Sequence, residues 1–391
     1  MKIQSIFHNI AASFCLSLFF VANVFAAPIV NVDQVLFVPN TEIEGMSNFA
    51  FGFSAARKSD GTILIGGVND DLPAVLRWTP GSGALISTMP IAENTERGFA
   101  NHTALLSDGT VRFFGHSTGG PQGTSRASYW NEAGELTVLI PDGAALITVG
   151  LGMSSNGVYA AGPNGSQETV YNLETGNRFE LFDTGSDTAG LVNNQGVAAG
   201  TGIWKSDNYG VKLHGSLKGE FDVNGAYSGI TDRYILGNYF SVDPNTLETT
   251  SHAALWDLET LEMLADFGAN TTTQIGSLAE DDGVAFLSVM NSITGDSSMW
   301  GWSIEDGLFQ LEIPELSGYS FASFPFFLDK GSLEIFGFGT RLSDGVNGFF
   351  YLHANAQSVA APEPGTWLLL AVAMFSAVYS RRFNPKFSKV V

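Results

Sequence analysis

Short apolar runs separated by polar turns recur along most of the chain. Seven segments share a turn built on Gly, Asp or Asn next to an apolar run: Lys58–Gly67, Leu106–Gly115, Ser154–Gly162, Asn193–Gly200, Thr231–Gly237, Glu280–Ser288 and Leu328–Gly337. The turn glycines Gly61, Gly109 and Gly157 follow each other at intervals of 48 residues, and Gly283 and Gly331 are again 48 apart. Because glycine tolerates the positive φ of a tight hairpin, each segment predicts two antiparallel strands.

Two further strands follow these hairpins. In six copies the third apolar run ends on an aromatic residue: Trp78, Trp130, Tyr171, Trp256, Trp302 and Tyr351. Another turn then leads into a fourth run, as in Gly83–Pro90 and Gly307–Pro314. Four short strands in a unit of ~45 residues are the pattern of a β-propeller blade. One blade cannot bury both of its faces, so the blades have to stack in a ring.

The pattern therefore predicts an all-β fold, a β-propeller of seven four-stranded blades over residues 27–360. Two of the copies between Gly157 and Trp256 are short, so six or eight blades stay open, as does a pair of β-sandwich domains. The seventh copy stops after its third strand, whereas Val32–Pro39 has the pattern of a fourth strand. We expect Val32–Pro39 to complete the last blade and to remove an open sheet edge.

The repeats also resemble a known extracellular repeat. In the first copy, Ser59–Thr62 (SDGT), Gly66–Gly67 and the run ending on Trp78 match the order of the HAF repeat motif. The resemblance implies an extracellular β-propeller, in agreement with the strand pattern.

The first apolar run of the chain has a different character. Lys2 precedes an apolar stretch, Ile10–Val21, and Val24 and Ala26 are small residues that flank a cleavage point. This order is typical of a secretory signal peptide, here residues 1–26, with the apolar stretch as its helix. The only cysteine, Cys15, lies inside this segment, so the remaining chain cannot depend on disulfides.

A second apolar run lies near the end of the chain, in residues 361–391. A Pro-Glu-Pro sequence at Pro362–Pro364 precedes Gly365–Ser380, which contains no charged residue, and Arg381 and Arg382 follow. A helix over 365–380 would be roughly 24 Å long, against about 30 Å for the hydrocarbon core of a bilayer. Basic residues directly after such a run resist translocation, so a membrane-inserted helix with a cytoplasmic end is expected. An ordinary single-span anchor remains an alternative.

The three parts of this tail, in this order, resemble the PEP-CTERM sorting signal. The resemblance implies a membrane protease, exosortase, as a processing partner, and delivery to the envelope, surface or exopolysaccharide matrix of a Gram-negative bacterium. The residues that carry it are Pro362, Glu363, Pro364, Arg381 and Arg382.

The net negative charge of the chain makes some classes of binding partner unfavourable. All 39 acidic residues lie between Asp33 and Glu363, whereas only 13 of the 18 basic residues lie in residues 28–364. This segment, with a net charge of −26, repels phosphate backbones, so we expect no nucleic-acid partner. An acidic polysaccharide would need a bridging cation.

Candidate catalytic motifs are weak. Gly115–Gly119 spells G-x-S-x-G, but the Gly- and Pro-rich residues that follow cannot start the helix of a nucleophile elbow, so we expect a glycine-rich loop. The six histidines, His8, His102, His116, His214, His252 and His353, have no metal-ligand spacing, and Glu280–Asp282 lacks the spacing of a calcium loop. No metal and no cofactor is therefore expected.

These observations favour a non-catalytic binding or structural protein outside the cell, with extracellular polysaccharide as a candidate ligand. The recurrent aromatic residues could stack on sugars, but their fixed place in the repeat favours packing between blades. The alternative is a secreted hydrolase or lyase that acts on polysaccharide through paired carboxylates at the mouth of the propeller. Two carboxylates facing each other, one of them held protonated by burial, would favour the enzyme.

Overall fold

A computed structural model describes residues 32–119, 123–139, 151–164, 167–181, 189–200, 202–205, 211–214, 226–243, 245–246, 248–273, 277–281, 283–311, 313–321, 326–328 and 333–354. The chain divides into two compact units, and the described residues all belong to the unit Val32–Ala356. The predicted signal peptide and sorting tail, including Val24, Ala26, Pro362, Glu363, Pro364, Arg381, Arg382 and both predicted helices, lie outside the described residues.

The described strands form seven sheets, numbered here in chain order. Sheet 1 contains β2 (Ile43–Glu44), β3 (Phe49–Arg57), β4 (Ile63–Asn69), β5 (Leu72–Thr79) and β6 (Gly83–Thr88). Sheet 2 contains β7 (Arg97–Leu105), β8 (Val111–Gly119), β9 (Thr124–Asn131) and β10 (Leu136–Val138). Sheet 3 contains β11 (Gly152–Met153), β12 (Tyr159–Asn164), β13 (Gln167–Asn172) and β14 (Arg178–Glu180).

The second half of the unit repeats this order. Sheet 4 contains β15 (Ala189–Val192), β16 (Val197–Gly200), β17 (Ile203–Lys205) and β18 (Val211–His214). Sheet 5 contains β19 (Ala226–Ile230), β20 (Tyr234–Val242), β21 (Thr249–Asp257) and β22 (Met263–Ala269). Sheet 6 contains β23 (Thr271–Thr272), β24 (Leu278–Asp281), β25 (Val284–Asn291), β26 (Ser297–Ser303) and β27 (Gly307–Leu311). Sheet 7 contains β28 (Tyr319–Phe321), β29 (Phe326–Leu328), β30 (Leu333–Arg341), β31 (Val346–Ala354) and β1 (Val32–Pro39).

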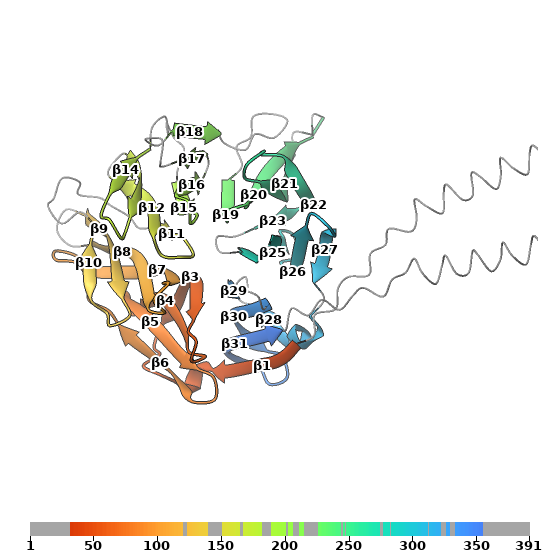
Figure 1. The fold of residues 1–391 in the computed structure, drawn as a ribbon. Coiled ribbons are helices and arrows are strands. Elements are labelled where there is room, and N and C mark those ends of the chain that lie inside the picture. The colour runs from red at the N-terminus through yellow and green to blue at the C-terminus, as the bar shows by residue number, and fades with distance from the viewer. Residues whose placement is uncertain are drawn as a thin grey trace, which may run out of the picture. The chain divides into compact units, whose positions relative to one another are not determined.

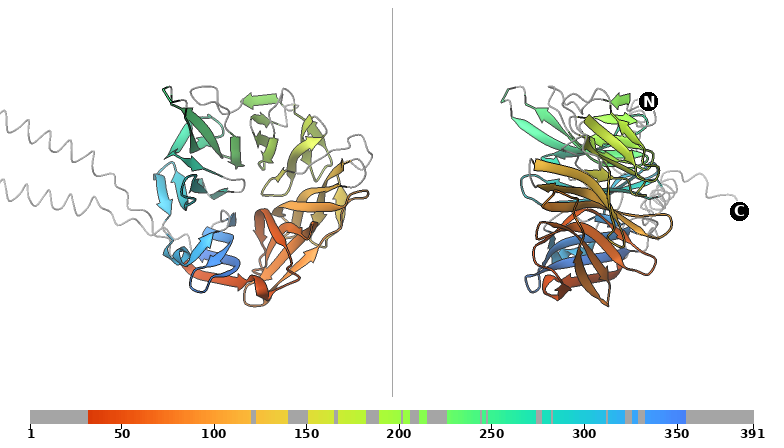
Figure 2. Two further views of the ribbon diagram at one scale, coloured as in Figure 1. Left: turned by 180° about the vertical axis from the view of Figure 1, so that it is seen from behind. Right: turned by 90° about the vertical axis from the view of Figure 1, so that its left-hand side faces the viewer.

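The sheets stand around a central axis, which is the arrangement of a β-propeller (Figure 1 and Figure 2). The all-β propeller prediction is therefore confirmed. The prediction of four strands in every blade is wrong for three sheets. In sheet 1, β2 adds a parallel strand beside β6, and in sheets 6 and 7 two short strands, instead of one, pair with β25 and with β30.

The helical elements of the described part of the chain include two short 3-10 turns, η1 (Asn40–Glu42) and η4 (Pro314–Gly318). None of the helices within the described ranges is long and apolar enough to cross a membrane.

Apolar clusters lie between neighbouring sheets. Ile65 and Trp78 of sheet 1 pack with Phe336 of sheet 7, and the rings of Trp78 and Phe336 are 6.3 Å apart. The six aromatic residues predicted to pack between blades, Trp78, Trp130, Tyr171, Trp256, Trp302 and Tyr351, are each 9% exposed or less. The packing role is confirmed, and these rings are too buried to stack on a sugar.

The two ends of the unit meet in sheet 7. β1 pairs in antiparallel orientation with β31, with Val35 opposite Leu352 and Phe37 opposite Phe350. The predicted completion of the last blade by Val32–Pro39 is confirmed. This pairing covers an edge of sheet 7 that would otherwise expose unpaired backbone groups.

The expectation of a loop at Gly115–Gly119 is wrong. These residues form the end of β8, where all five pair with β9 and residues 115–118 also pair with β7. Ser117 is completely buried, and its Oγ accepts a hydrogen bond from the Ala92 amide at 3.2 Å. A Cβ at Gly115 would lie 1.9 Å from the Phe99 carbonyl oxygen, so glycine is required by close strand packing. The motif is structural.

Candidate functional site

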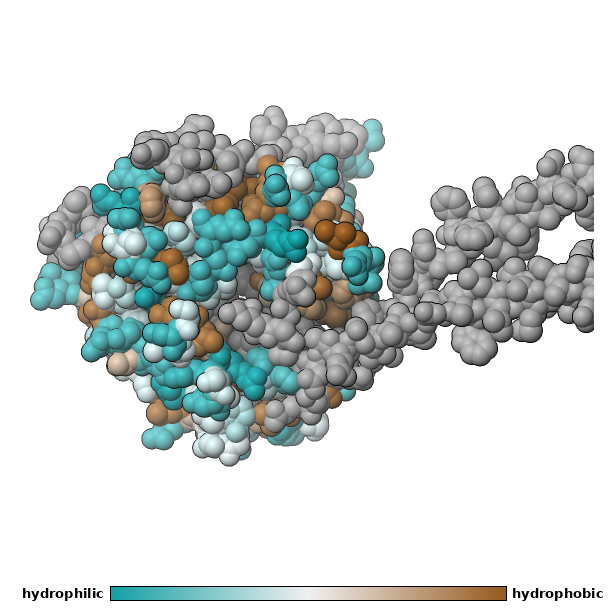
Figure 3. Space-filling view, viewed as in Figure 1, coloured by the Kyte–Doolittle hydropathy of each residue, from teal (hydrophilic) through white to brown (hydrophobic). Residues whose placement is uncertain are grey.

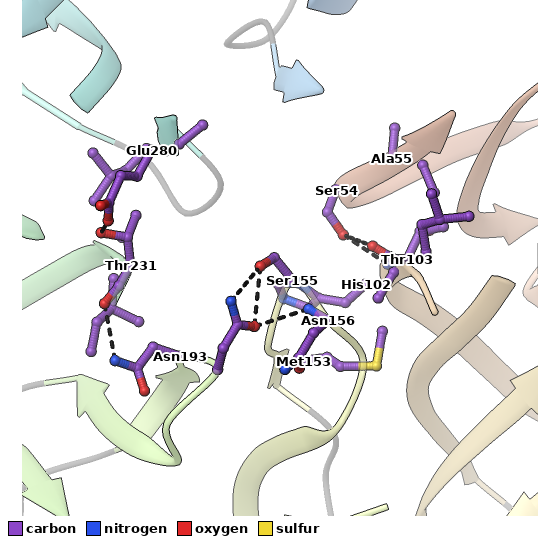
Figure 4. A pocket seen from close by; sticks show the side chains of 18 of the residues that line it. Ser54, Ala55, His102, Thr103, Met153, Ser155, Asn156, Asn193, Thr231 and Glu280 are labelled. Atoms are coloured by element: carbon purple, nitrogen blue, oxygen red, sulfur yellow. Dashed lines mark hydrogen bonds between the residues drawn. The ribbon is translucent and has the colours of Figure 1, made fainter. Parts of the chain in front are cut away.

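A cavity of about 940 Å³, called here the axial cavity, lies at the hairpin-turn end of the sheets. It is lined by β3, β7, β11, β15 and β19 of sheets 1 to 5, each with the turn that follows it, by β24 and Gly283 of sheet 6, and by Glu334 of β30. The five strands from sheets 1 to 5 are edge strands, and their side chains face one shared space (Figure 4). A volume of this size is within the range of small-molecule sites.

Hydrogen bonds between sheets fix one side of the cavity. The Asn194 side chain of sheet 4 accepts a hydrogen bond from the Asn156 amide of sheet 3 at 2.9 Å, and it donates to Ser155 Oγ at 3.0 Å. The Asn194 amide donates to Asp232 Oδ1 of sheet 5 at 3.0 Å. Next to it, Thr231 Oγ1 donates to Glu280 Oε2 of sheet 6 at 2.6 Å (Figure 4). The polar groups of this wall are therefore held in place before any ligand binds.

The opposite side is fixed in a similar way. Ser54 Oγ on β3 donates to the Thr103 carbonyl at 2.9 Å and accepts from the Thr103 amide at 2.7 Å. Arg57 binds Glu334 of sheet 7, and the Tyr351 hydroxyl donates to the same carboxylate at 3.0 Å. The Glu334 side chain is only 3% exposed, and its negative charge is balanced by Arg57 inside the wall.

An imidazole and an aromatic ring interrupt the small polar lining. His102 on β7 is 7% exposed, and burial lowers its pKa to about 4, against a hydrogen bond with the Leu151 backbone that acts in the other direction. Its Nε2 atom has no hydrogen-bond partner. The Phe53 ring lies 5.7 Å from the His102 ring and is 38% exposed. At neutral pH this part of the wall is uncharged and amphipathic.

The charge of the lining is balanced, in contrast to the rest of the chain. The six charged residues are Arg57, Lys58, Arg233, Asp232, Glu280 and Glu334, three of each sign. Hydrophilic residues are also prominent near the centre of the face shown in Figure 3. A cavity of zero net charge within a segment of −26 favours an uncharged polar ligand over an ionic one.

The carboxylates of the cavity are occupied by other groups. Glu334 binds Arg57 and Tyr351, Glu280 accepts from Thr231, and Asp232 accepts from Asn194. The described carboxyls with a displaced pKa are Asp60, Asp108, Glu132, Asp243, Asp266 and Asp344, and in each the pKa is lowered. None of these six lines the cavity. Each of the three carboxylates that do line it has a partner in the described part of the wall.

No group of three or more His, Cys, Asp or Glu side chains that could hold a metal occurs among the residues with described positions. The predicted acidic turn at Glu280–Asp282 instead directs Glu280 toward Thr231. His102, His252 and His353 lie in three different sheets.

Sequence reasoning missed the residues that build the cavity. Ser54, His102 and Asn194 come from copies that are 40 residues or more apart, and only the ring brings them together. A usable signal was present for Ser54 and His102, since each lies inside the strand that precedes the turn of its copy, where a polar residue is unusual for a buried strand.

Comparisons with known proteins identify no family. No family model matches the chain, and no curated protein matches it. Among solved structures, the chain is similar to the tricorn protease, with 11% identity and a TM-score of 0.34 over 80% of this chain and 28% of that one. It is also similar to an oligogalacturonate lyase in complex with manganese, with 11% identity and a TM-score of 0.41 over 84% and 99% of the two chains.

A third similar structure is the α-L-arabinofuranosidase PaAbf62A from Podospora anserina in complex with cellotriose, with 10% identity and a TM-score of 0.33 over 84% and 98% of the two chains. The chain thus spans less than a third of the tricorn protease. At these TM-scores the similarities carry nothing about the activity of this chain.

Proposed function

We propose that the chain is an exported protein of the cell envelope or extracellular matrix that binds an uncharged, hydroxyl-rich ligand in its axial cavity. Outside the cell, a segment of an extracellular polysaccharide is a ligand that is both uncharged and rich in hydroxyl groups. In this proposal each of the seven sheets is one blade of a closed seven-bladed propeller. The cavity acts by binding, without transforming its ligand.

The balanced charge of the lining is the observation that carries this proposal. A neutral sugar offers hydroxyl groups for polar side chains and an apolar ring face for an aromatic residue. The cavity has both kinds of partner, in Asn156, Ser155 and the exposed ring of Phe53. Since inter-sheet hydrogen bonds already hold the polar groups, little ordering cost is paid on binding.

Titration of the purified chain with neutral oligosaccharides, prepared from the exopolysaccharide of the producing organism, tests the proposal. Phe53→Ala is expected to weaken binding about tenfold, or ~1.4 kcal/mol, because the apolar contact area of the ring is lost. Ile304→Ala is the control, since Ile304 is 78% exposed and is not part of the cavity lining. No measurable binding, or equal affinities for the two variants, would contradict the proposal.

We also propose that the tail resembling a PEP-CTERM signal is recognised and cut by an exosortase, after transient anchoring of the chain in the membrane. Replacement of Pro362, Glu363 and Pro364 by alanine is expected to leave the full-length protein in the membrane fraction. The measurement is the mass and location of the protein by immunoblotting and mass spectrometry. Unchanged release of the variant would favour a plain anchor or an unrelated cleavage.

A further inference from the structure

The outer half of the hairpin formed by β20 and β21 extends beyond the rest of sheet 5. β20 and β21 pair along nine residues each, from Tyr234 opposite Asp257 to Val242 opposite Thr249. On one side, β19 pairs with β20 only as far as Asn238, and on the other side β22 pairs with β21 only as far as His252. Residues 239–242 and 249–251 therefore form a two-stranded extension (Figure 1).

A serine, a histidine and an aspartate meet at the base of this extension. Ser241 Oγ lies 2.9 Å from His252 Nε2. On the other side of the imidazole, His252 Nδ1 lies 3.5 Å from Asp266 Oδ1 and has no other hydrogen-bond partner. The strand register explains this meeting, because Tyr239 is opposite His252, and Ser241 is therefore its diagonal neighbour on the same face.

Other contacts hold the imidazole and the carboxylate in this orientation. The Tyr239 ring stacks on the His252 ring at 4.7 Å, and its hydroxyl donates to Asp266 Oδ2 at 2.6 Å. The Gly268 amide donates to Asp266 Oδ1 at 2.8 Å. Burial would raise the pKa of Asp266, but the hydrogen bonds from Tyr239 and Gly268 and the adjacent His252 outweigh it and lower that pKa. The carboxylate therefore faces Nδ1 in its charged form.

This arrangement favours one tautomer of His252. A carboxylate beside Nδ1 favours the tautomer with a proton on Nδ1, and Nε2 then presents its lone pair to Ser241 Oγ. The 3.5 Å separation is longer than a standard hydrogen bond, as is common for catalytic contacts before a substrate binds.

We propose that Ser241, His252 and Asp266 form an acyl-transfer site that hydrolyses carboxylic esters. Ser241 is the nucleophile, His252 is the general base, and Asp266 is a positioning residue. The site is partly exposed, since the side chains of His252 and Asp266 are 16% and 39% exposed and Ser241 is half-buried. It is distinct from the axial cavity, because the seven steps along β20 from Tyr234 to Ser241 cover roughly 23 Å.

The reaction balances with water as the only co-reactant. Ser241 Oγ bonds to the ester carbonyl carbon while its proton moves to His252 Nε2. The carbon–oxygen bond to the leaving alkoxide then breaks, and Nε2 returns the proton to that oxygen. A water molecule next attacks the acyl group on Ser241 and gives its proton to Nε2. Release of the carboxylic acid returns the proton to Ser241 Oγ.

Labelling of the full chain with a fluorophosphonate, followed by peptide mass spectrometry, tests the site. The reaction joins Ser241 Oγ to phosphorus, and fluoride leaves. Ser241 is expected to be the labelled residue, and Ser241→Ala is expected to remain unlabelled. His252→Ala is expected to lower the labelling rate about 100-fold, and added imidazole to restore part of it, because only the proton acceptor is missing.

Two more variants separate a catalytic role from a structural one. Asp266→Asn is expected to lower the maximal labelling rate without changing the probe concentration that gives half of it. Ser251→Ala is the matched control and is expected to label like the wild type, since Ser251 pairs with Phe240 on the opposite face of the strand. Labelling at another residue, or equal rates for wild type, Ser241→Ala and His252→Ala, would overturn the proposal and leave the axial cavity proposal untouched.

Discussion

His102 is a titratable side chain placed where its charged form is poorly solvated. Its ring lies in the wall of the axial cavity, and burial lowers its pKa to about 4 from an ordinary value of 6.5. The folded chain therefore binds this proton less tightly than the unfolded chain does. Between pH 6.5 and pH 4 the unfolded state holds more protons, so the free energy of unfolding falls as the pH falls.

This imbalance gives a measurable pH dependence. From pH 7.5 to pH 4.5, the wild-type chain is expected to lose roughly 2 to 3 kcal/mol more stability than His102→Gln, in which the titrating group is absent. Urea unfolding of both proteins at the two pH values measures the difference, and the other titrating groups cancel. Equal losses in the free energy of unfolding of the two proteins would show that protonation of His102 does not destabilise the fold.

At the scale of elements, the hairpins were predictable because their signal is local. The turn glycines Gly61, Gly109, Gly157 and Gly283 have φ values between +71° and +85°, as the sequence pattern requires. The segment Gly115–Gly119 was mispredicted because Gly115 is required by close packing against the Phe99 carbonyl of the paired strand β7, and not by a turn. A glycine needed for close approach looks the same, in sequence alone, as a glycine needed for a turn.

The two candidate sites were hidden from sequence reasoning for a related reason. Ser241, His252 and Asp266 lie 11 and 14 residues apart, and their meeting depends on the pairing register of three strands. A shift of one residue would turn Ser241 to the other face of the sheet. The axial cavity depends on ring closure, which brings together residues from many copies.

At the scale of the whole unit, the fold was predictable because the same strand pattern returns seven times, although two of the copies are short. β1, the first strand of the unit, pairs with β31, the last one, and its removal tests this architecture. Removal of Val32–Pro39 takes away its ladder with β31 and the buried side chain of Val38. We expect a cost on the order of 5 kcal/mol and a fall in Tm of about 10 °C, with association of the exposed edges.

The control is a chain that begins at Val32 and so keeps β1. Thermal unfolding measures the Tm of the two truncated chains, and light scattering measures their molar mass in solution. The longer form keeps the strand and is expected to have the oligomeric state and the Tm of the parent. An unaltered Tm after loss of Val32–Pro39 would mean that the stability of the ring does not depend on the pairing of β1 with β31.

The pairing of β1 with β31 also determines when the ring can close during synthesis of the chain. During translation the N-terminal strand emerges first, but its partner, Val346–Ala354, emerges more than 300 residues later. Until then Ile65 and Trp78 lack the Phe336 surface that covers them in the finished ring. The ring of a nascent chain therefore cannot close before residues 346–354 have been made.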